Sequence, residues 1–249
     1  MKQNKKNLVL GLAVIACLLI VFLASVLFKK ESVESYRSIK VQENEGVTEV
    51  TRMEEALTAY AGMKLEQGDN VYVTKDSNMI MQLDDDKYVY AEENTKFHLE
   101  VSGQKDNGKV KICLSEGAVL IEIQNKLAED DLFEVETSNA IMAVRGTVFY
   151  VETGKNETGA ALTKVSVFEG KVETTGEGQA EEGVQVPSGL SVTLTGDINP
   201  VEQQEEVQLE ELPVTVLSHL SKMEEKEEMY FEKEEILQIQ PLPSCFLDI

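Results

Sequence analysis

The chain has few of the residues on which most enzymes depend. Among 249 residues there are two histidines, His98 and His219, which lie in separate segments, and three cysteines. No Gly-x-Ser-x-Gly, Cys-x-x-Cys or His-Glu-x-x-His motif occurs, and no glycine-rich phosphate loop lies between a predicted strand and a helix. Since catalysis needs a nucleophile with a base, a metal site or paired carboxylates, we predict that the chain is not an enzyme and binds no cofactor. A hydrolase is the least favoured alternative.

Basic residues are a minority. Lysine and arginine number 23 against 45 aspartates and glutamates, which gives a formal net charge of −22. Such a chain repels the phosphates of nucleic acids and the headgroups of anionic lipids, so we expect no nucleic acid as a partner. The charge is typical of a soluble, self-repelling surface.

Two motifs are weak signals for other sites. The aspartates Asp84, Asp85 and Asp86 are adjacent, whereas a calcium loop spaces its ligands along about a dozen residues. Because they separate two stretches of apolar alternation, they favour a hairpin turn, and we predict no metal site. The triplet Asn156-Glu157-Thr158 has the form of a glycosylation sequon, but its meaning depends on the organism.

One long hydrophobic run lies near the N-terminus. Residues 8–28 contain a single polar side chain, Ser25, and follow a heptapeptide with three lysines. A helix of this length spans about 31 Å, enough to cross the hydrocarbon core, whereas the apolar part of a secretory signal is shorter. We predict a cytoplasmic tail over 1–7, a transmembrane helix over 8–28 that acts as a signal anchor, and a polar linker over 29–40.

The predicted topology places the N-terminus in the cytoplasm and everything after the helix outside it. Positive charges on the two sides of the helix nearly balance, and a heptapeptide stays inside more readily than the long remainder of the chain. We therefore expect a single-pass protein of the cell membrane. An alternative is a lipoprotein lipidated at Cys17, because Val14–Cys17 resembles a lipoprotein cleavage site, although the apolar run continues beyond it.

Residues 41–197 predict an all-β domain. Short stretches that alternate apolar and polar residues, rich in valine, isoleucine, threonine and aromatic residues, are separated by turn residues about every dozen positions. Glu-Gly pairs at 45–46, 116–117, 169–170 and 182–183 are typical of hairpin turns or bulges. The expected architecture is stacked or rolled antiparallel sheets, and a closed barrel is an alternative.

Residues 198–249 form an acidic C-terminal segment that we predict to be partly helical. Val216, Leu220, Met223, Tyr230 and Leu237 follow a three-to-four-residue rhythm, which Glu227 and Glu234 interrupt. The favoured interpretation is a surface helix that covers one end of the β-domain. A partner-binding helix and disorder are alternatives.

Two cysteines are candidates for a disulfide. Cys113 and Cys245 would share the oxidising side of the membrane, where they have the chance to pair. In the stretch around Cys113, the alternation puts Val110, Ile112 and Leu114 on the buried face, and therefore Cys113 on the other. Two cysteines so far apart in the sequence are weak evidence for a disulfide framework, so the pairing of Cys113 with Cys245 stays an open alternative.

Arg145 and Gly146 interrupt a stretch that otherwise predicts a strand. A glycine inside a strand indicates a bulge or a close approach of two backbone segments. The arginine has five donors for strand-end carbonyls or a carboxylate. We favour a structural role, in which Gly146 lets the chain turn a corner and Arg145 ties it, over contact with a ligand.

The segments around this pair resemble the extracytoplasmic domain of the FecR family, named for ferric citrate regulation. The resemblance rests on "TSNAIMAVRGTVF", on "VSVFEGKV" and, upstream, on "LEQGD", and it extends over roughly residues 40–197. The matching positions are Thr137, Ala140, Val144, Arg145, Gly146, Thr147, Phe149, Val165, Val167, Glu169, Gly170 and Val172, with Leu65, Gly68 and Asp69 upstream.

The resemblance implies a β-rich, non-catalytic module in a bacterial cell envelope. Well-known members relay a signal from a surface transporter through one membrane helix to a sigma factor. Those members carry a cytoplasmic domain ahead of the helix, whereas seven residues precede residues 8–28 here, so direct control of a sigma factor is not expected. We expect binding of an envelope protein or polymer, as sensor or scaffold, with signal relay to a second membrane protein or transcription regulator as the alternative.

Overall fold

Two β-sheets make up most of the structure. The computed structural model describes residues 38–104, 107–128, 131–176, 183–195, 204–223 and 229–239. Sheet A contains, from edge to edge, β1 (Ile39–Glu45), β5 (Asn78–Leu83), β6 (Lys87–Ala91), β8 (Asn107–Ile123), β11 (Val148–Lys155), β12 (Ala161–Glu169), β15 (Leu190–Thr195) and β16 (Gln204–Glu206). Sheet B contains β3 (Glu55–Thr58), β2 (Thr48–Arg52), β4 (Asn70–Val73), β7 (Thr95–Gln104), β8 again, β9 (Leu132–Glu136), β10 (Ala140–Val144), β13 (Lys171–Gly176) and β14 (Val184–Pro187).

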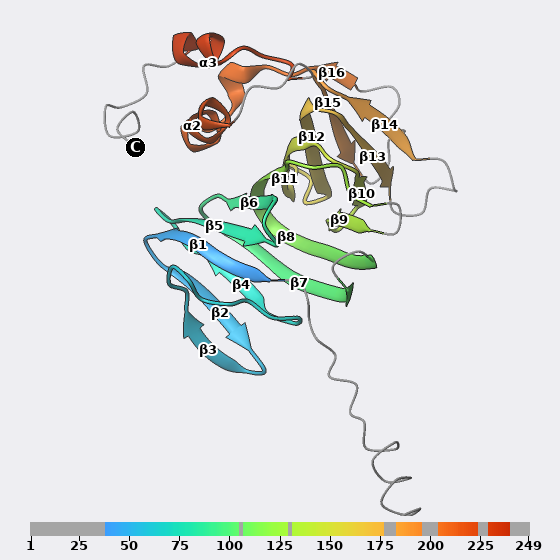
Figure 1. Cartoon of the computed structure of the whole chain (residues 1–249). Helices are drawn as coiled ribbons and strands as arrows, with labels where there is room; N and C mark the ends of the chain where they lie inside the picture. The colour runs from blue at the N-terminus through green and yellow to red at the C-terminus, as the bar shows by residue number, and fades with distance from the viewer. Residues whose placement is uncertain are drawn as a thin grey trace, which may run out of the picture. The chain divides into compact units, whose positions relative to one another are not determined.

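Strand β8 belongs to both sheets (Figure 1). Its first part pairs with β7 and β9 in sheet B, and its last part pairs with β6 and β11 in sheet A. The change occurs at Gly117, whose φ of +89° is rarely adopted by other residues. A Cβ there would lie 2.6 Å from the Cα of buried Thr95, so the close approach of β7 also requires glycine. Gly46 and Gly170, two other glycines of the predicted turns, likewise lie where the chain changes sheet rather than in simple hairpins.

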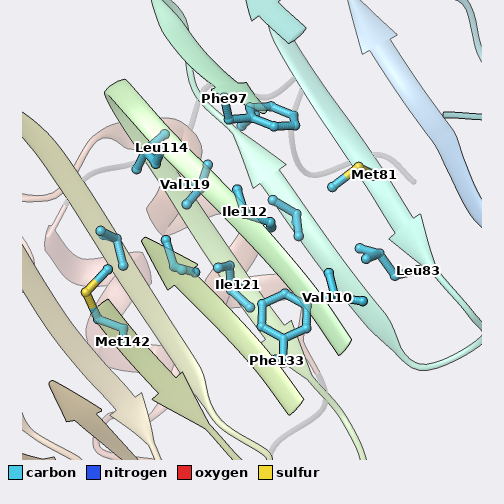
Figure 2. Close-up of a cluster of buried hydrophobic side chains, with 14 of the residues drawn as sticks. Met81, Leu83, Phe97, Val110, Ile112, Leu114, Val119, Ile121, Phe133 and Met142 are labelled. Carbon is cyan, nitrogen blue, oxygen red and sulfur yellow. The ribbon is translucent and has the colours of Figure 1, made fainter. Parts of the chain in front are cut away.

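The main core lies between the two sheets. Period-two alternation sends one set of side chains from most strands inward, and the valines, isoleucines and phenylalanines of that set are almost completely buried. Figure 2 shows the part around β8, where Val110, Ile112, Leu114, Val119 and Ile121 follow one strand through both sheets. Between positions 41 and 195 the described residues form strands joined by turns and loops, so the all-β prediction for this region is confirmed.

The C-terminal segment packs on the outer face of sheet A. It contains β16, the short 3-10 helix η2 (Leu209–Glu211), α2 (Val214–Lys222) and α3 (Lys233–Ile239), drawn in orange and red in Figure 1. Val216, Leu217 and Leu220 of α2 form a second buried cluster with outward-facing side chains of sheet A, among them Leu120 and Phe168. A short amphipathic helix gains most of its stability from such packing.

One pairing corrects the expectation of purely antiparallel sheets. β9 runs parallel to the first part of β8. The reason is that β8 ends in sheet A, so the chain must return to sheet B before β9 begins at Leu132 alongside the beginning of β8.

The predicted membrane helix at 8–28 lies outside the described residues. Within the ranges given above, no helix is long and apolar enough to span a bilayer. The tail at 1–7, Cys17 and most of the linker at 29–40 also lie outside them.

Candidate functional site

The Arg145-Gly146 pair lies at the corner where the chain leaves β10 in sheet B for β11 in sheet A. Gly146 has a φ of +106°, and a Cβ on it would lie 3.1 Å from the Cα of Lys126. Both the backbone angle and the close approach therefore favour glycine. The Arg145 side chain is exposed and lines an open groove of about 500 Å³ together with Asp131 and Glu173.

A second crossing between the sheets lies directly against the first. Gly170, between β12 and β13, has a φ of +73°, and a Cβ on it would lie 2.8 Å from the carbonyl oxygen of Gly146 and 3.0 Å from Cγ2 of Thr147. The strands on either side are in register, with Val144 opposite Val172 and Val148 opposite Glu169. The two separated sequence blocks thus meet at one corner, which we call the double corner (residues 144–148 and 169–172).

The remaining residues of the first block are buried around this corner. Four of them are no more than 3% exposed to solvent and are therefore closely packed against neighbouring residues: Ala140, Val144, Thr147 and Phe149. Glu169 is also buried. Small side chains at Ala140 and Thr147 suit this tight packing, because additional methylene groups would overfill the core.

Thr137 joins a buried polar network that connects the two sheets. Its hydroxyl oxygen lies 2.9 Å from that of Thr163 in β12, and the Thr163 hydroxyl donates to the side-chain oxygen of Asn139 at 2.6 Å. The Asn139 amide donates to the carbonyl oxygen of Leu194 in β15 at 2.8 Å. Each of these three buried side chains therefore has a hydrogen-bond partner. Sequence reasoning missed Asn139 and Thr163, because their contact spans residues far apart in the chain.

Asp69 is held by an arginine that sequence reasoning also missed. Its carboxylate is fully buried and accepts two hydrogen bonds from Arg52, from Nε at 2.8 Å and Nη2 at 2.8 Å. It also accepts the backbone N–H of Glu66, while the hydrogen bond to Asp69 raises the pKa of Arg52. The preceding Gly68 has a φ of +89° and donates its N–H to the carbonyl of Leu99. The bidentate pair closes the loop between β3 and β4 onto β2.

Part of the chain is similar to known proteins. The model of the family described as "FecR protein" matches residues 69–173, which include Asp69 and the whole double corner. Residues 69–173 therefore resemble a FecR domain, and we call the β-domain that contains them (residues 41–197) the FecR domain. No curated protein matches. Two crystal structures of a "putative anti-sigma factor" from Parabacteroides distasonis ATCC 8503, at 2.50 Å and 1.65 Å resolution, are similar at 18% identity with a TM-score of 0.45. The alignments cover 61% of this chain and 64% and 65% of those chains.

The cysteine of the FecR domain faces outward, as the alternation predicts. Cys113 is half-buried on β8, while its neighbours Ile112 and Leu114 are in the core. Partial burial and the carboxylates of Glu100 and Glu136 raise the pKa of its thiol. It forms no disulfide with any described residue, and Cys245 lies outside them, so their pairing stays a prediction.

The three aspartates of the FecR domain form the predicted turn between β5 and β6. Two of them form ion pairs with a lysine of the same hairpin, since Lys87 Nζ lies 2.6 Å from Asp86 and 3.6 Å from Asp84. Within the described ranges, no group of three histidine, cysteine or acidic side chains is placed to hold a metal ion.

Two half-buried ionisable groups, Glu92 and His219, lie where α2 packs on sheet A. Burial raises the pKa of Glu92, whose carboxylate accepts a hydrogen bond from Thr215 in the first turn of the helix. Burial, with a smaller effect of nearby Lys222, lowers the pKa of His219 to about 4, and its ring contacts Tyr90 with centroids 4.4 Å apart. His219 is therefore neutral at pH 7.

Beside α2 the same face of the FecR domain is open and forms a groove of about 530 Å³. Its floor includes Tyr88 and Tyr90 of β6 and Glu122 of β8, and Lys222 of α2 lies along its edge. Sequence reasoning missed this groove, although the spacing of two residues between the tyrosines places them on one face of a strand.

Proposed function

We propose that this chain is a membrane-anchored module in which the FecR domain lies outside the cytoplasm and binds another envelope protein or an envelope polymer, as a sensor or scaffold. The match to the FecR family over residues 69–173 is the observation that carries the proposal. The apolar run at residues 8–28 supports the membrane anchor, since its length suits a bilayer span.

The placement of the family residues supports a binding rather than a catalytic module. Gly146, Gly170 and Thr137 serve the connection between the two sheets, and Asp69 is engaged by Arg52. When the residues shared by a family fix the fold, the surface residues can differ from one family member to another. Such a surface suits the recognition of different partners.

Protease treatment of intact cells tests the topology. Antibodies against the FecR domain should detect loss of the domain when protease is added outside the cytoplasmic membrane, while a cytoplasmic control protein stays whole. If the domain is degraded only after lysis, the extracytoplasmic location and every role proposed for it are wrong.

Cross-linking in living cells tests the binding role. The full chain, with photoreactive residues placed on the exposed face of sheet B or beside α2, should give reproducible cross-links to an envelope protein or polymer. Transcript profiling of a deletion strain distinguishes a scaffold from a signal relay. Deletion of a scaffold should change the transcripts of no set of co-regulated genes, whereas deletion of a signal relay should change one such set. Absence of any reproducible cross-link from either face would contradict the binding role.

A further inference from the structure

The outer face of sheet A is divided into a covered half and an open half. The half around Leu120, Val148 and Phe168 is apolar and lies under the C-terminal segment. The other half lies in the groove beside α2, and apart from Ile80 its outward side chains are aromatic, amide and carboxylate groups. Because the volume of about 530 Å³ lies in the range of small-ligand sites, the open half can accommodate one or two sugar rings.

The aromatic floor of the groove is fixed by hydrogen bonds. The rings of Tyr88 and Tyr90 lie within 28° of parallel, with centroids 6.4 Å apart. Gln82 Nε2 lies 3.2 Å from the Tyr88 hydroxyl, and the Tyr90 hydroxyl donates to Glu122 at 2.8 Å. His219 covers part of Tyr90, whereas Tyr88 is half-buried at the open end. The floor is thus ordered before any ligand arrives, which lowers the entropy cost of binding.

The charges in the groove disfavour an ionic ligand. Glu122 is buried, and each of its oxygens already accepts a hydrogen bond, one from Tyr90 and one from Gln124 at 3.0 Å. Lys222 on one side and Glu43 on the other place opposite charges at the edge. The overall charge of −22 further opposes an anion. The exposed amide of Gln42 lines the same groove and can both donate and accept hydrogen bonds.

The geometry points to a carbohydrate site: the groove binds neutral sugar units of an envelope glycan, with a pyranose ring packed on Tyr88 and a hydroxyl group bonded to Gln42. Polarised C–H groups of a sugar pack well on the negative face of an aromatic ring, and amide side chains match hydroxyl groups as donors and acceptors. This inference rests on the proposed envelope-binding function and specifies its ligand class.

The test uses the full chain in lipid nanodiscs, because many detergents carry sugar headgroups. An array of neutral oligosaccharides, with α- and β-linked hexoses and N-acetylhexosamines, is probed first, and positive sugars are then titrated by calorimetry. Tyrosine fluorescence gives a second signal, since the chain has seven tyrosines and no tryptophan. Tetralysine and trigalacturonate serve as cationic and anionic probes.

We expect at least one neutral oligosaccharide to bind, and Tyr88→Ala to weaken it by about tenfold or more. Tyr88→Phe keeps the ring and should retain binding within about threefold. Tyr72→Ala, on β4 of the other sheet, is the matched control and should change nothing. Thermal midpoints verify that each variant is folded.

The inference is overturned if no neutral sugar binds, if Tyr88→Ala binds as the wild type does, or if tetralysine or trigalacturonate binds at Tyr88 in preference to the sugars. These outcomes leave the proposed function intact as long as cross-linking in cells recovers a protein partner. If cross-linking also fails, the proposed function fails with it.

Discussion

Two places in the FecR domain show two ways in which residues shared with a family fix a shape. At the double corner, Gly146 and Gly170 allow two backbone segments to approach so closely that a Cβ on Gly170 would lie 2.8 Å from a carbonyl oxygen. At the loop before β4, the buried carboxylate of Asp69 is held by two hydrogen bonds from Arg52. The first is a steric requirement and the second is an electrostatic one.

The difference bears on which substitutions each place tolerates. Backbone atoms at the double corner cannot move without shifting four strands, so added side-chain atoms have nowhere to go. Arg52 is 21% exposed, so water can partly replace a lost partner there. Substitutions at the steric site should therefore cost more than substitutions at the ion pair.

The largest effect is expected from Gly170→Val. Positive φ and the clash with Gly146 act together, and the free energy of unfolding should fall by about 4 kcal/mol. Gly62→Val is the matched control, because Gly62 has a φ of +93° but no atom within 4 Å of an added Cβ. Urea titration of both variants separates the clash from the strain. Equal losses would show that close approach plays no part.

Gly146→Val should destabilise the domain by roughly 2–4 kcal/mol, somewhat less than Gly170→Val, because the nearest atom lies at 3.1 Å. The thermal midpoint should fall by several degrees. Gly154→Val in β11 is the control, since an added Cβ there meets nothing within 4 Å and its φ is not positive. An unchanged midpoint in Gly146→Val would remove the steric account of this corner.

Asp69→Asn should cost about 2 kcal/mol, because the amide keeps the shape but loses the charge that holds Arg52. A double-mutant cycle with Arg52→Gln should give a coupling energy of about 1–2 kcal/mol in urea titrations. If the effects of the two substitutions simply add, the pair does not stabilise the loop.

The smallest effect concerns pH and the contact between α2 and sheet A. The pKa of His219 is about 4 in the folded state against an ordinary 6.5, so between these values the unfolded chain binds a proton that the folded chain does not. Stability should therefore fall as pH falls from about 6.5 to about 4.

The comparison variant is His219→Gln, which should lose less stability than the wild type over that range. Glu92 acts in the opposite direction, because its raised pKa makes the folded chain bind a proton more readily, so Glu92→Gln should steepen the loss. Thermal midpoints measured at several pH values test both. Parallel curves for the wild type and His219→Gln would contradict the contribution of the histidine.

Much of the fold could be predicted from local pattern. The alternation around Cys113 identified which of its neighbours are buried, and the aspartates at 84–86 indicated the turn between β5 and β6. Glycine pairs marked places of unusual backbone, but not that the chain changes sheet there, because a change of sheet depends on strands that lie far away in sequence. The parallel pairing of β9 with β8 was missed for the same reason.

The partners of individual side chains were beyond sequence reasoning. Arg52 meets Asp69 because β2 pairs with β4, and Asn139 reaches Leu194 across 55 positions. The position of α2 over Leu120 decides which half of sheet A stays open, and nothing in the helix sequence alone specifies that face.

The sharing of β8 by both sheets has a consequence for how the nascent chain folds on the ribosome. β1, β5 and β6 form one partial sheet, β2, β3, β4 and β7 another, and the two are joined along a common strand only after residue 123 has been synthesised. Until then each partial sheet has an unpaired edge exposed to other chains. We expect assembly to be slow and to depend on the completion of this strand, so truncation before it should yield aggregates rather than a smaller domain.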